Sequence, residues 1–258
     1  MDIRDFDTGF FSLTGKNAIV TGGNTGLGQA FSLALAKAGA NVLVPSVVDD
    51  DGATCALLQA EGVRAESMLC DLTTPGVPKT IVEACVQSFG SVDILVNSAG
   101  VCPMADLLDF GRAPWDATVE VNLTAAFEMS YEAAQWMVPV RSGKIINVCS
   151  VFTFLGGQHS PAYAATKHGI AGLTKAYCDE LAPFDIQVNG IAPGYYATAL
   201  TEATRNDPES SRRILEHIPA GRWGDPADLM GAVVFLASRA SDYVNGHILS
   251  VDGGYLVR

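Results

Sequence analysis

The sequence predicts an α/β fold in which a doubly wound, parallel sheet of seven strands is covered by helices on both faces. Short runs rich in Val, Ile and Leu alternate with longer amphipathic stretches along the 258 residues, and strands that are apolar throughout belong to a sheet buried on both faces. A glycine-rich turn follows the first apolar run, where such folds bind ligands. No linker or internal repeat divides the chain, so we expect residues 1–258 to form a single domain.

The elements follow from the spacing of the apolar residues. The predicted strands cover residues 18–20, 42–44, 65–69, 94–96, 145–148, 188–191 and 248–251. The stretches between them are long enough for helical crossovers between parallel strands. The predicted helices include residues 28–38, 80–89, 115–136, 162–181 and 226–238. Ligands of a doubly wound sheet bind outside the carboxyl ends of its strands, so we expect the functional residues just after each strand.

The charge balance argues against nucleic acid as a partner. Sixteen Lys and Arg against 28 Asp and Glu give a net charge of −12, whereas affinity for a phosphate backbone comes from clustered cations. No run approaches the roughly 20 apolar residues of a membrane span, so we expect no membrane partner. The N-terminus is acidic where a targeting peptide is basic, which favours a cytoplasmic address.

The cysteines and histidines give no sign of a metal site. The six cysteines and four histidines are dispersed, without a Cys-x-x-Cys pair or a His-Glu-x-x-His motif, so we expect neither a disulfide framework nor bound metal. The charged fraction is 17% and the mean hydropathy is +0.23. This apolar surplus favours an oligomer.

The turn after the first predicted strand is typical of a phosphate-binding turn. Residues 21–28 read TGGNTGLG and lead directly into a helical pattern. Glycines let the backbone turn tightly and approach a phosphate, while free N–H groups and the helix dipole meet its negative charge. We expect a dinucleotide pyrophosphate here, although glycines at such a turn can also serve packing alone. The residues expected to bind it are Gly22, Asn24, Thr25, Gly26, Leu27 and Gly28.

The end of the second predicted strand bears on the choice between NAD and NADP. Ser46 stands there, and the first acidic residues are Asp49, Asp50 and Asp51. No Lys or Arg lies nearby to bind a 2′-phosphate, and three carboxylates would repel one. This favours NAD as the cofactor without excluding NADP. The alternative is that the three acids only begin a solvated helix.

A tyrosine and a lysine four residues apart follow the fifth predicted strand. On a helix Tyr163 and Lys167 lie on the same face. A phenol with a reference pKa of about 10 is a poor acid–base catalyst near neutrality, and a nearby ammonium is expected to lower that pKa. Ser150, at the end of the strand, can bind the same substrate oxygen as the tyrosine. The set indicates carbonyl reduction or its reverse, although a Tyr–Lys pair at this spacing also occurs by chance.

Taken together, these residues resemble the short-chain dehydrogenase/reductase family, and the match runs from Leu13 to Arg258. It rests on Thr21-Gly22-x-x-x-Gly26-x-Gly28, Asp71-Leu72, Asn97-Ser98-Ala99-Gly100, Asn122, Ser150, Tyr163-x-x-x-Lys167 and Pro193-Gly194. The resemblance implies a Rossmann fold and an NAD(P)-dependent oxidoreductase. It also implies that Ser150, Tyr163, Lys167 and Asn122 are the catalytic residues, with Asn122 supporting a proton-relay water.

The same resemblance implies the remaining cofactor contacts. Asp71, grouped with Leu72, would hold the adenine, and Lys167 would bind the nicotinamide ribose beside Tyr163. Residues implied at the adenine ribose are Asn97, Ala99 and Gly100, and those at the nicotinamide end are Pro193, Gly194, Tyr196 and Thr198. Two residues depart from the family pattern: Ser98 replaces a usual Asn, and Ser46 replaces the Asp usual in NAD-preferring members.

Within the family, the chain looks similar to the sugar-acid subgroup that includes gluconate 5-dehydrogenase and 2-dehydro-3-deoxygluconate 5-dehydrogenase. The similarity rests on residues 191–195, 218–224, 241–246 and 251–254. It implies a homotetramer, and a substrate that is a sugar acid or a keto-deoxy sugar acid.

The expected pocket leaves a second substrate class open. Residues 101–104 and 151–154 are largely apolar, whereas a substrate carboxylate favours an arginine or another cation. The candidates are His159, Arg205 and Arg112, while His217 and Arg213 are expected to face solvent or a neighbour. We expect residues 197–218 to cap the pocket.

The sequence therefore predicts an oxidoreductase that transfers a hydride between NAD(P) and a secondary alcohol or ketone. The preferred substrate is a sugar acid, and a neutral or apolar ketone is the alternative. A non-catalytic NAD-binding scaffold is a second alternative, although no structural need explains all four polar residues of the catalytic set.

Overall fold

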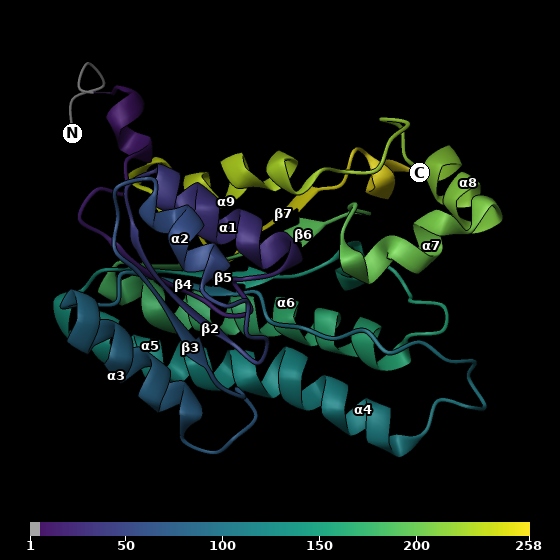
Figure 1. The fold of residues 1–258 in the computed structure, drawn as a ribbon, viewed down its shortest axis with the longest axis horizontal. Coiled ribbons are helices and arrows are strands. Elements are labelled where there is room, and N and C mark those ends of the chain that lie inside the picture. The colour runs from purple at the N-terminus through teal and green to yellow at the C-terminus, as the bar shows by residue number, and fades with distance from the viewer. Residues whose placement is uncertain (1–5) are drawn as a thin grey trace.

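Seven parallel strands form the centre of the molecule (Figure 1). The computed structural model describes residues 6–258, so the first five residues of the acidic N-terminus lie outside the described part. The strands are β1 (Asn17–Val20), β2 (Asn41–Ser46), β3 (Ala65–Leu69), β4 (Ile94–Asn97), β5 (Gly143–Val148), β6 (Ile186–Pro193) and β7 (Ile248–Val251). They pair in the order β3-β2-β1-β4-β5-β6-β7. The chain changes direction across the sheet between β1 and β4, which makes this the switch point where ligands bind.

Helices cover both faces of the sheet, which confirms the predicted doubly wound class. One layer holds α1 (Gly26–Lys37), α2 (Ala53–Gln59) and α9 (Met230–Ala237), and the other holds α3 (Val77–Phe89), α4 (Arg112–Val119), α5 (Ala125–Val140) and α6 (Pro161–Leu181) (Figure 1). Each layer has its own apolar core against the sheet. The first core includes Phe31, Leu35, Leu58, Val233 and Leu236, and the second includes Ile81, Val82, Met129 and Met137.

Two predicted helices have different bounds in the structure. The stretch predicted as one helix over 115–136 is divided into α4, a π-helical segment from Glu120 to Thr124, and α5. The stretch predicted over 226–238 begins as a 3-10 turn, Pro226–Leu229, and becomes α9 only at Met230. Helix α2 was anticipated only as the alternative in which the three acids begin a solvated helix, because its seven residues are too few to show a clear apolar period.

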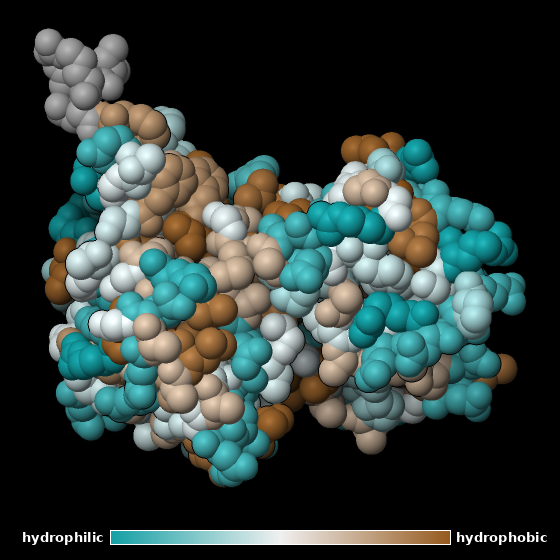
Figure 2. All heavy atoms as spheres, turned by 45° about the horizontal axis from the view of Figure 1, so that its top comes forward, coloured by the Kyte–Doolittle hydropathy of each residue, from teal (hydrophilic) through white to brown (hydrophobic). Residues whose placement is uncertain are grey.

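The chain between β6 and α9 forms two short helices beyond the end of the sheet. They are α7 (Glu202–Asn206) and α8 (Pro208–His217), and they lie beside the C-terminus in Figure 1. Asp207 caps α8, because its Oδ2 accepts a hydrogen bond from the amide of Ser210 (3.0 Å). Figure 2 shows a mostly hydrophilic surface over this end of the molecule.

Within residues 6–258, every helix is too short or too polar to cross a membrane.

The central strands should carry much of the stability. Leu95 of β4 is fully buried, whereas Leu108, in the loop that follows, is 97% exposed. We expect Leu95→Ala to lower the free energy of unfolding by about 2 to 5 kcal/mol, because it removes buried methyl groups and leaves a cavity. Leu108→Ala, the same change in a solvated position, should alter it by less than about 0.5 kcal/mol. Urea denaturation followed by circular dichroism measures both, and equal values for the two variants would contradict this assignment of the core.

Candidate functional site

The glycine turn after β1 has a conformation that side chains would obstruct. Gly22 and Gly26 have positive φ angles of 62° and 50°, which only glycine adopts at no steric cost. A β-carbon at Gly28 would overlap the carbonyl oxygen of Gly22, and one at Gly22 would lie 3.2 Å from the Cα of Ala99. The first turn of α1 therefore packs directly on the end of β1.

The start of α1 presents free donors to this turn. The N-cap residue, Thr25, makes no side-chain capping bond, so the first N–H groups of the helix are available to an anion. Nearby, Asn24 donates through Nδ2 to the carbonyl of Val48 (2.7 Å). Its Oδ1 is buried and has no hydrogen-bond partner among the described residues. The glycines, the uncapped helix and this polar atom fit a dinucleotide pyrophosphate and its adjoining ribose.

The acids after β2 serve local structure. Asp50 accepts a hydrogen bond from the amide of Thr54 (2.9 Å) at the start of α2, and bonds of this kind lower its pKa. Asp49 accepts from the amide of Asp51 (3.0 Å). Ser46 is buried, and its Oγ accepts from the amide of Val48 (3.0 Å). The structure thus agrees with the alternative in which these acids begin a helix. Ser46 is then the polar side chain at the end of β2.

The residues that the family resemblance implies at the adenine and its ribose differ in which of their atoms a ligand could bind. Asp71 is exposed, and it accepts hydrogen bonds from the amide and the hydroxyl of Thr73 (2.9 and 2.8 Å). Leu72 is buried in the core. The Nδ2 of Asn97 is hydrogen-bonded to Asn147 Oδ1 (2.8 Å) and Ser130 Oγ (3.0 Å) inside the protein. The Oδ1 of Asn97 is buried and has no hydrogen-bond partner among the described residues, whereas for Leu72 the backbone is the part that remains available to a ligand.

The predicted catalytic residues Ser150, Tyr163 and Lys167 come together at the carboxyl end of β5. Ser150 follows β5, and its hydroxyl lies close enough to the phenol of Tyr163, from α6, to favour the ionised form of that phenol. The ammonium of Lys167 lies 5.4 Å from the centre of the Tyr163 ring, and it donates to the carbonyl of Val148 (2.6 Å). Lys167 is only 5% exposed. One phenol, one hydroxyl and one ammonium thus share a small, largely water-free space.

Burial controls the ionisation of this group. It raises the pKa of the Tyr163 phenol well above its usual range, while the nearby Ser150 hydroxyl acts in the opposite direction. Burial likewise lowers the pKa of the Lys167 ammonium. The expected lowering of the Tyr163 pKa is therefore not found, because the loss of hydration outweighs the favourable interactions. The raised pKa keeps the phenol protonated near neutral pH and makes it a weaker acid than a free tyrosine.

Asn122 lies in the π-helical segment between α4 and α5. Its Oδ1 accepts from the amide of Val101 (2.8 Å), and its Nδ2 donates to the carbonyl of Val101 (2.9 Å) and to Thr166 Oγ1 (3.3 Å). These bonds join the loop after β4 to the residue preceding Lys167. π-Helical turns of this kind are frequent at functional sites.

Residues after β6 were expected at the nicotinamide end of the cofactor. Pro193 ends β6, and Gly194 is packed so closely that a β-carbon would lie 2.7 Å from the Cα of Asp252. Thr198 lies opposite the start of α1, since a β-carbon at Gly26 would be 3.9 Å from the Thr198 side chain. The hydroxyl of Tyr196 donates to the carbonyl of Val251 (2.8 Å) in the interior. The side chain of Tyr196 is thus part of the core, and its backbone is what borders the site.

Tyr195, which the sequence analysis did not single out, belongs to the pocket instead. Its ring packs edge-on against Phe152 and Trp223, with 6.4 and 5.7 Å between the ring centroids. The centroid of the Tyr255 ring lies 5.1 Å from that of Tyr195. Phe152 in turn packs edge-on against Tyr163 (6.0 Å). An aromatic wall therefore extends from the Tyr163 ring to the C-terminal residues. The alternation of side chains along β6 does not predict this position of Tyr195, because the strand ends at Pro193, before Tyr195.

The candidate cations differ in whether an acidic side chain of the protein already lies next to them. Asp106 lies 2.8 Å from His159, and Asp116 lies 2.6 Å from Arg112. His217 packs against the Tyr255 ring at 4.3 Å, so it meets a neighbouring side chain, as expected.

Two arginines of the capping segment remain available. Arg205 donates to the carbonyl of Thr198 (3.1 Å). Arg213 is exposed on α8, and its charge lies close enough to Tyr195 to favour the phenolate of that residue, although burial dominates and raises the pKa of Tyr195.

A phosphate-binding turn at the switch point of a parallel sheet, with a buried Ser-Tyr-Lys group beside it, defines a pyridine-nucleotide oxidoreductase. Comparison with known proteins agrees: the family model adh_short_C2, described as enoyl-(acyl carrier protein) reductase, matches residues 22–256. The chain belongs to the short-chain dehydrogenase/reductase family, whose members use NAD(P).

Relatives match over nearly the full length. The chain is 64% identical to the uncharacterized oxidoreductase YgcW of Escherichia coli, over 99% of this chain and 98% of that protein. It is 46% identical to the 2-dehydro-3-deoxy-D-gluconate 5-dehydrogenase of Escherichia coli, over 96% and 98% respectively. Among solved structures, a gluconate 5-dehydrogenase from Burkholderia cenocepacia in complex with NADP and tartrate superposes with a TM-score of 0.92 at 38% identity, covering 96% of this chain and 98% of that one.

The ionisation of Tyr163 can be measured directly. Because burial raises its pKa, we expect the phenol to stay protonated in the free protein up to at least about pH 10. The difference between the phenolate absorbance of the wild type and that of Tyr163→Phe, followed through a pH titration, isolates this residue from the other tyrosines. A Tyr163 phenolate signal near neutral pH would contradict the dominance of burial.

Proposed function

We propose that the protein interconverts a ketone and a secondary alcohol on a sugar acid or keto-deoxy sugar acid. The observation that carries the proposal is the group at the end of β5, in which the Lys167 ammonium lies 5.4 Å from the centre of the Tyr163 ring and Ser150 lies near the same phenol. The bound dinucleotide supplies or accepts the hydride. Tyr163 gives its proton to the new alkoxide during reduction and takes it back during oxidation, while the Ser150 hydroxyl orients the same oxygen.

Lys167 and Asn122 support this proton transfer. Lys167 would bind the nicotinamide ribose and hold positive charge near the phenol, which stabilises the phenolate that remains after proton donation. Asn122 is a positioning residue, because its side chain is bonded to Val101 and Thr166, and we propose that its segment holds the proton-relay water. In the free protein the raised pKa keeps the proton on Tyr163 near neutral pH, which is the form of the residue that acts as the acid in reduction.

A substrate carboxylate is supported by relatives and by charge. Relatives at 40 to 46% identity are named as 2-dehydro-3-deoxy-D-gluconate 5-dehydrogenase and 5-keto-D-gluconate 5-reductase. Arg213 is exposed on α8, within the segment that follows β6, and it is our candidate partner for the carboxylate. We propose that residues 197–218, which carry it, cap the pocket of a single catalytic domain.

A neutral ketone is the alternative, and the aromatic wall favours it. Phe152 packs against both Tyr163 and Tyr195, and Cys102 lies near enough to affect the ionisation of Tyr163. An apolar lining of this kind suits a substrate without charge. Membership in a family of oxidoreductases, together with the complete catalytic set, leaves no support for a non-catalytic scaffold.

For the cofactor, we propose NAD in preference to NADP. The described residues at the end of β2 include the carboxylates of Asp49, Asp50 and Asp51 but no Lys or Arg in residues 45–51, and a 2′-phosphate favours an arginine. NADP in the related gluconate 5-dehydrogenase structure makes the comparison of NADH with NADPH a necessary part of any assay. The cytoplasmic address stays a prediction from the acidic N-terminus.

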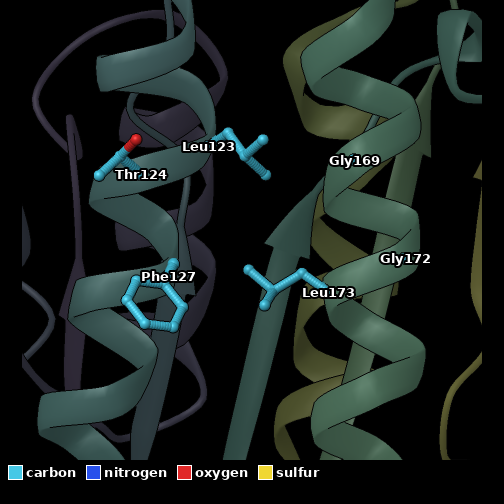
Figure 3. Close-up of a pocket in the computed structure, with 6 residues that line it drawn as sticks. All are labelled: Leu123, Thr124, Phe127, Gly169, Gly172 and Leu173. Atoms are coloured by element: carbon cyan, nitrogen blue, oxygen red, sulfur yellow. The ribbon is translucent and has the colours of Figure 1, made fainter.

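We also propose a homotetramer, and one exposed apolar groove supports a subunit contact. It lies between two helices, and Leu123, Thr124 and Phe127 face Gly169, Gly172 and Leu173 across it (Figure 3). Phe127 is 47% exposed, and Tyr131, one turn later on the same helix α5, is 52% exposed. Large exposed apolar side chains grouped in this way are typical of interfaces.

Turnover of matched substrates tests the proposed reaction. Keto sugar acids should oxidise NADH faster than neutral ketones of equal size, and NADH should serve better than NADPH. Tyr163→Phe should lower kcat by at least about a hundredfold, because the general acid is lost, while NADH binding by fluorescence stays within about twofold. If only neutral ketones react, the aromatic-wall alternative is correct. Unchanged turnover in Tyr163→Phe would overturn the mechanism.

A charge in the groove tests the proposed assembly. Gly172 is exposed on α6, and no other group lies within 4 Å of the position of its β-carbon. Gly172→Glu should therefore leave the protomer folded, with helix propensity if anything improved, while placing an unpaired charge in the interface. We expect light scattering to show a tetramer for the wild type and smaller species for the variant. Gln87→Glu, on exposed α3, is the control, and equal masses for all three proteins would rule out this groove as a contact.

A further inference from the structure

Arg205 on α7 has a hydrogen-bonding capacity that the protein does not use. Its Nη2 donates to the carbonyl of Thr198 (3.1 Å). Its Nε is buried and has no hydrogen-bond partner among the described residues. A guanidinium is always charged and carries five N–H donors, so a buried Nε–H without an acceptor indicates that an acceptor is supplied from outside the chain. No carboxylate of residues 6–258 pairs with Arg205 at ion-pair distance.

The location of Arg205 identifies the kind of acceptor. Thr198, to which it is bonded, lies against the start of α1, within 3.9 Å of where a β-carbon of Gly26 would be. A single residue, Thr198, therefore lies in space between Arg205 and the uncapped N-terminus of α1 with its glycine turn. An anion held at that turn would lie between α1 and α7.

Charge also argues for a cation at this place. The turn itself, residues 21–28, contains no Lys or Arg, and the whole chain has a net charge of −12. A pyrophosphate carries two negative charges, and the helix end offers only a partial positive charge. A guanidinium can bind phosphate oxygens through two parallel N–H bonds, which suits this ligand better than a single amide.

We propose that Arg205 binds the dinucleotide phosphate that carries the nicotinamide ribose. Thr198 and Arg205 follow β6, and the family resemblance implies that the residues after β6 border the nicotinamide end, so the nearer phosphate would be the one joined to that ribose.

The proposal concerns the dinucleotide alone and holds whether or not the substrate is a sugar acid. ADP and AMP separate the two phosphates, because AMP lacks the second one. We would measure the Kd of the full chain for each nucleotide by calorimetry, for the wild type and for Arg205→Gln, Arg205→Lys and Arg212→Gln. Arg212 is the matched control, since it is an exposed arginine of the same segment that pairs with Glu216 at 2.8 Å.

Arg205→Gln should weaken ADP binding by about tenfold, which is the usual effect of losing a charge-assisted bond, and AMP binding by less than about twofold. Arg205→Lys should fall between Arg205→Gln and the wild type, because it keeps the charge but not the planar pair of donors. Arg212→Gln should match the wild type with both nucleotides. The affinity of the wild type for ADP should also fall more steeply with added salt than that of Arg205→Gln.

Two results would overturn the proposal. Wild-type ADP affinity in Arg205→Gln would mean that the guanidinium does not reach the phosphate. An equal loss for ADP and AMP, with a lowered melting temperature, would mean that Arg205 serves only to hold Thr198 in place.

Discussion

The contact between the first turn of α1 and the end of β1 is the constraint on which the rest of the structure depends. At Gly28 a side chain would overlap the Gly22 carbonyl, and at Gly23 a β-carbon would lie 2.7 Å from the carbonyl oxygen of Val20. Ser32, one turn later, donates to the carbonyl of Gly23 (2.8 Å) and closes the contact. Only because the helix starts this close can Phe31 and Leu35 be fully buried against the sheet. The same approach brings free N–H groups to the switch point.

A second set of buried polar contacts fixes the catalytic half. Asn147 of β5 accepts from Asn97 of β4 (2.8 Å) and donates to Thr174 of α6 (2.9 Å), and all three are almost fully buried. Amides and hydroxyls away from water are costly unless bonded to one another, so this chain of bonds admits little rearrangement. It holds α6 at a set height against the strands. Tyr163 and Lys167, on the same helix, are thereby placed relative to Ser150.

The sequence predicted most of the frame, because apolar period and glycine position are local signals. All seven strands were predicted, and β3 and β7 have the predicted bounds. The helix over 115–136 was too long, because no apolar period reveals that the side chain of Asn122 is bonded to the loop after β4. The candidate catalytic group was predicted through the spacing of Tyr163 and Lys167. The pKa of Tyr163 could not be predicted in the same way, because it depends on how much water remains around the phenol. That in turn depends on the packing of the whole protein.

The pocket was harder to predict than the frame for the same reason. Tyr195 and Tyr196 are adjacent and identical, and only the direction of the chain after β6 sends one ring to the aromatic wall and the other to the core. The unpartnered Nε of Arg205 could not be predicted either. It results from a short helix that folds back over Thr198, far from any periodic pattern.

The exposed loop after β4 has a consequence for how such proteins diversify. Met104, Leu107 and Leu108 are 65%, 79% and 97% exposed, so exchanging them removes almost nothing from the core. Replacements at these three positions should therefore cost little stability and need no compensating mutations elsewhere. That freedom is consistent with a model described for enoyl reductases and relatives named for sugar-acid chemistry both matching one chain. Membership in this family therefore shows that the fold is shared, whereas the substrate can differ between members.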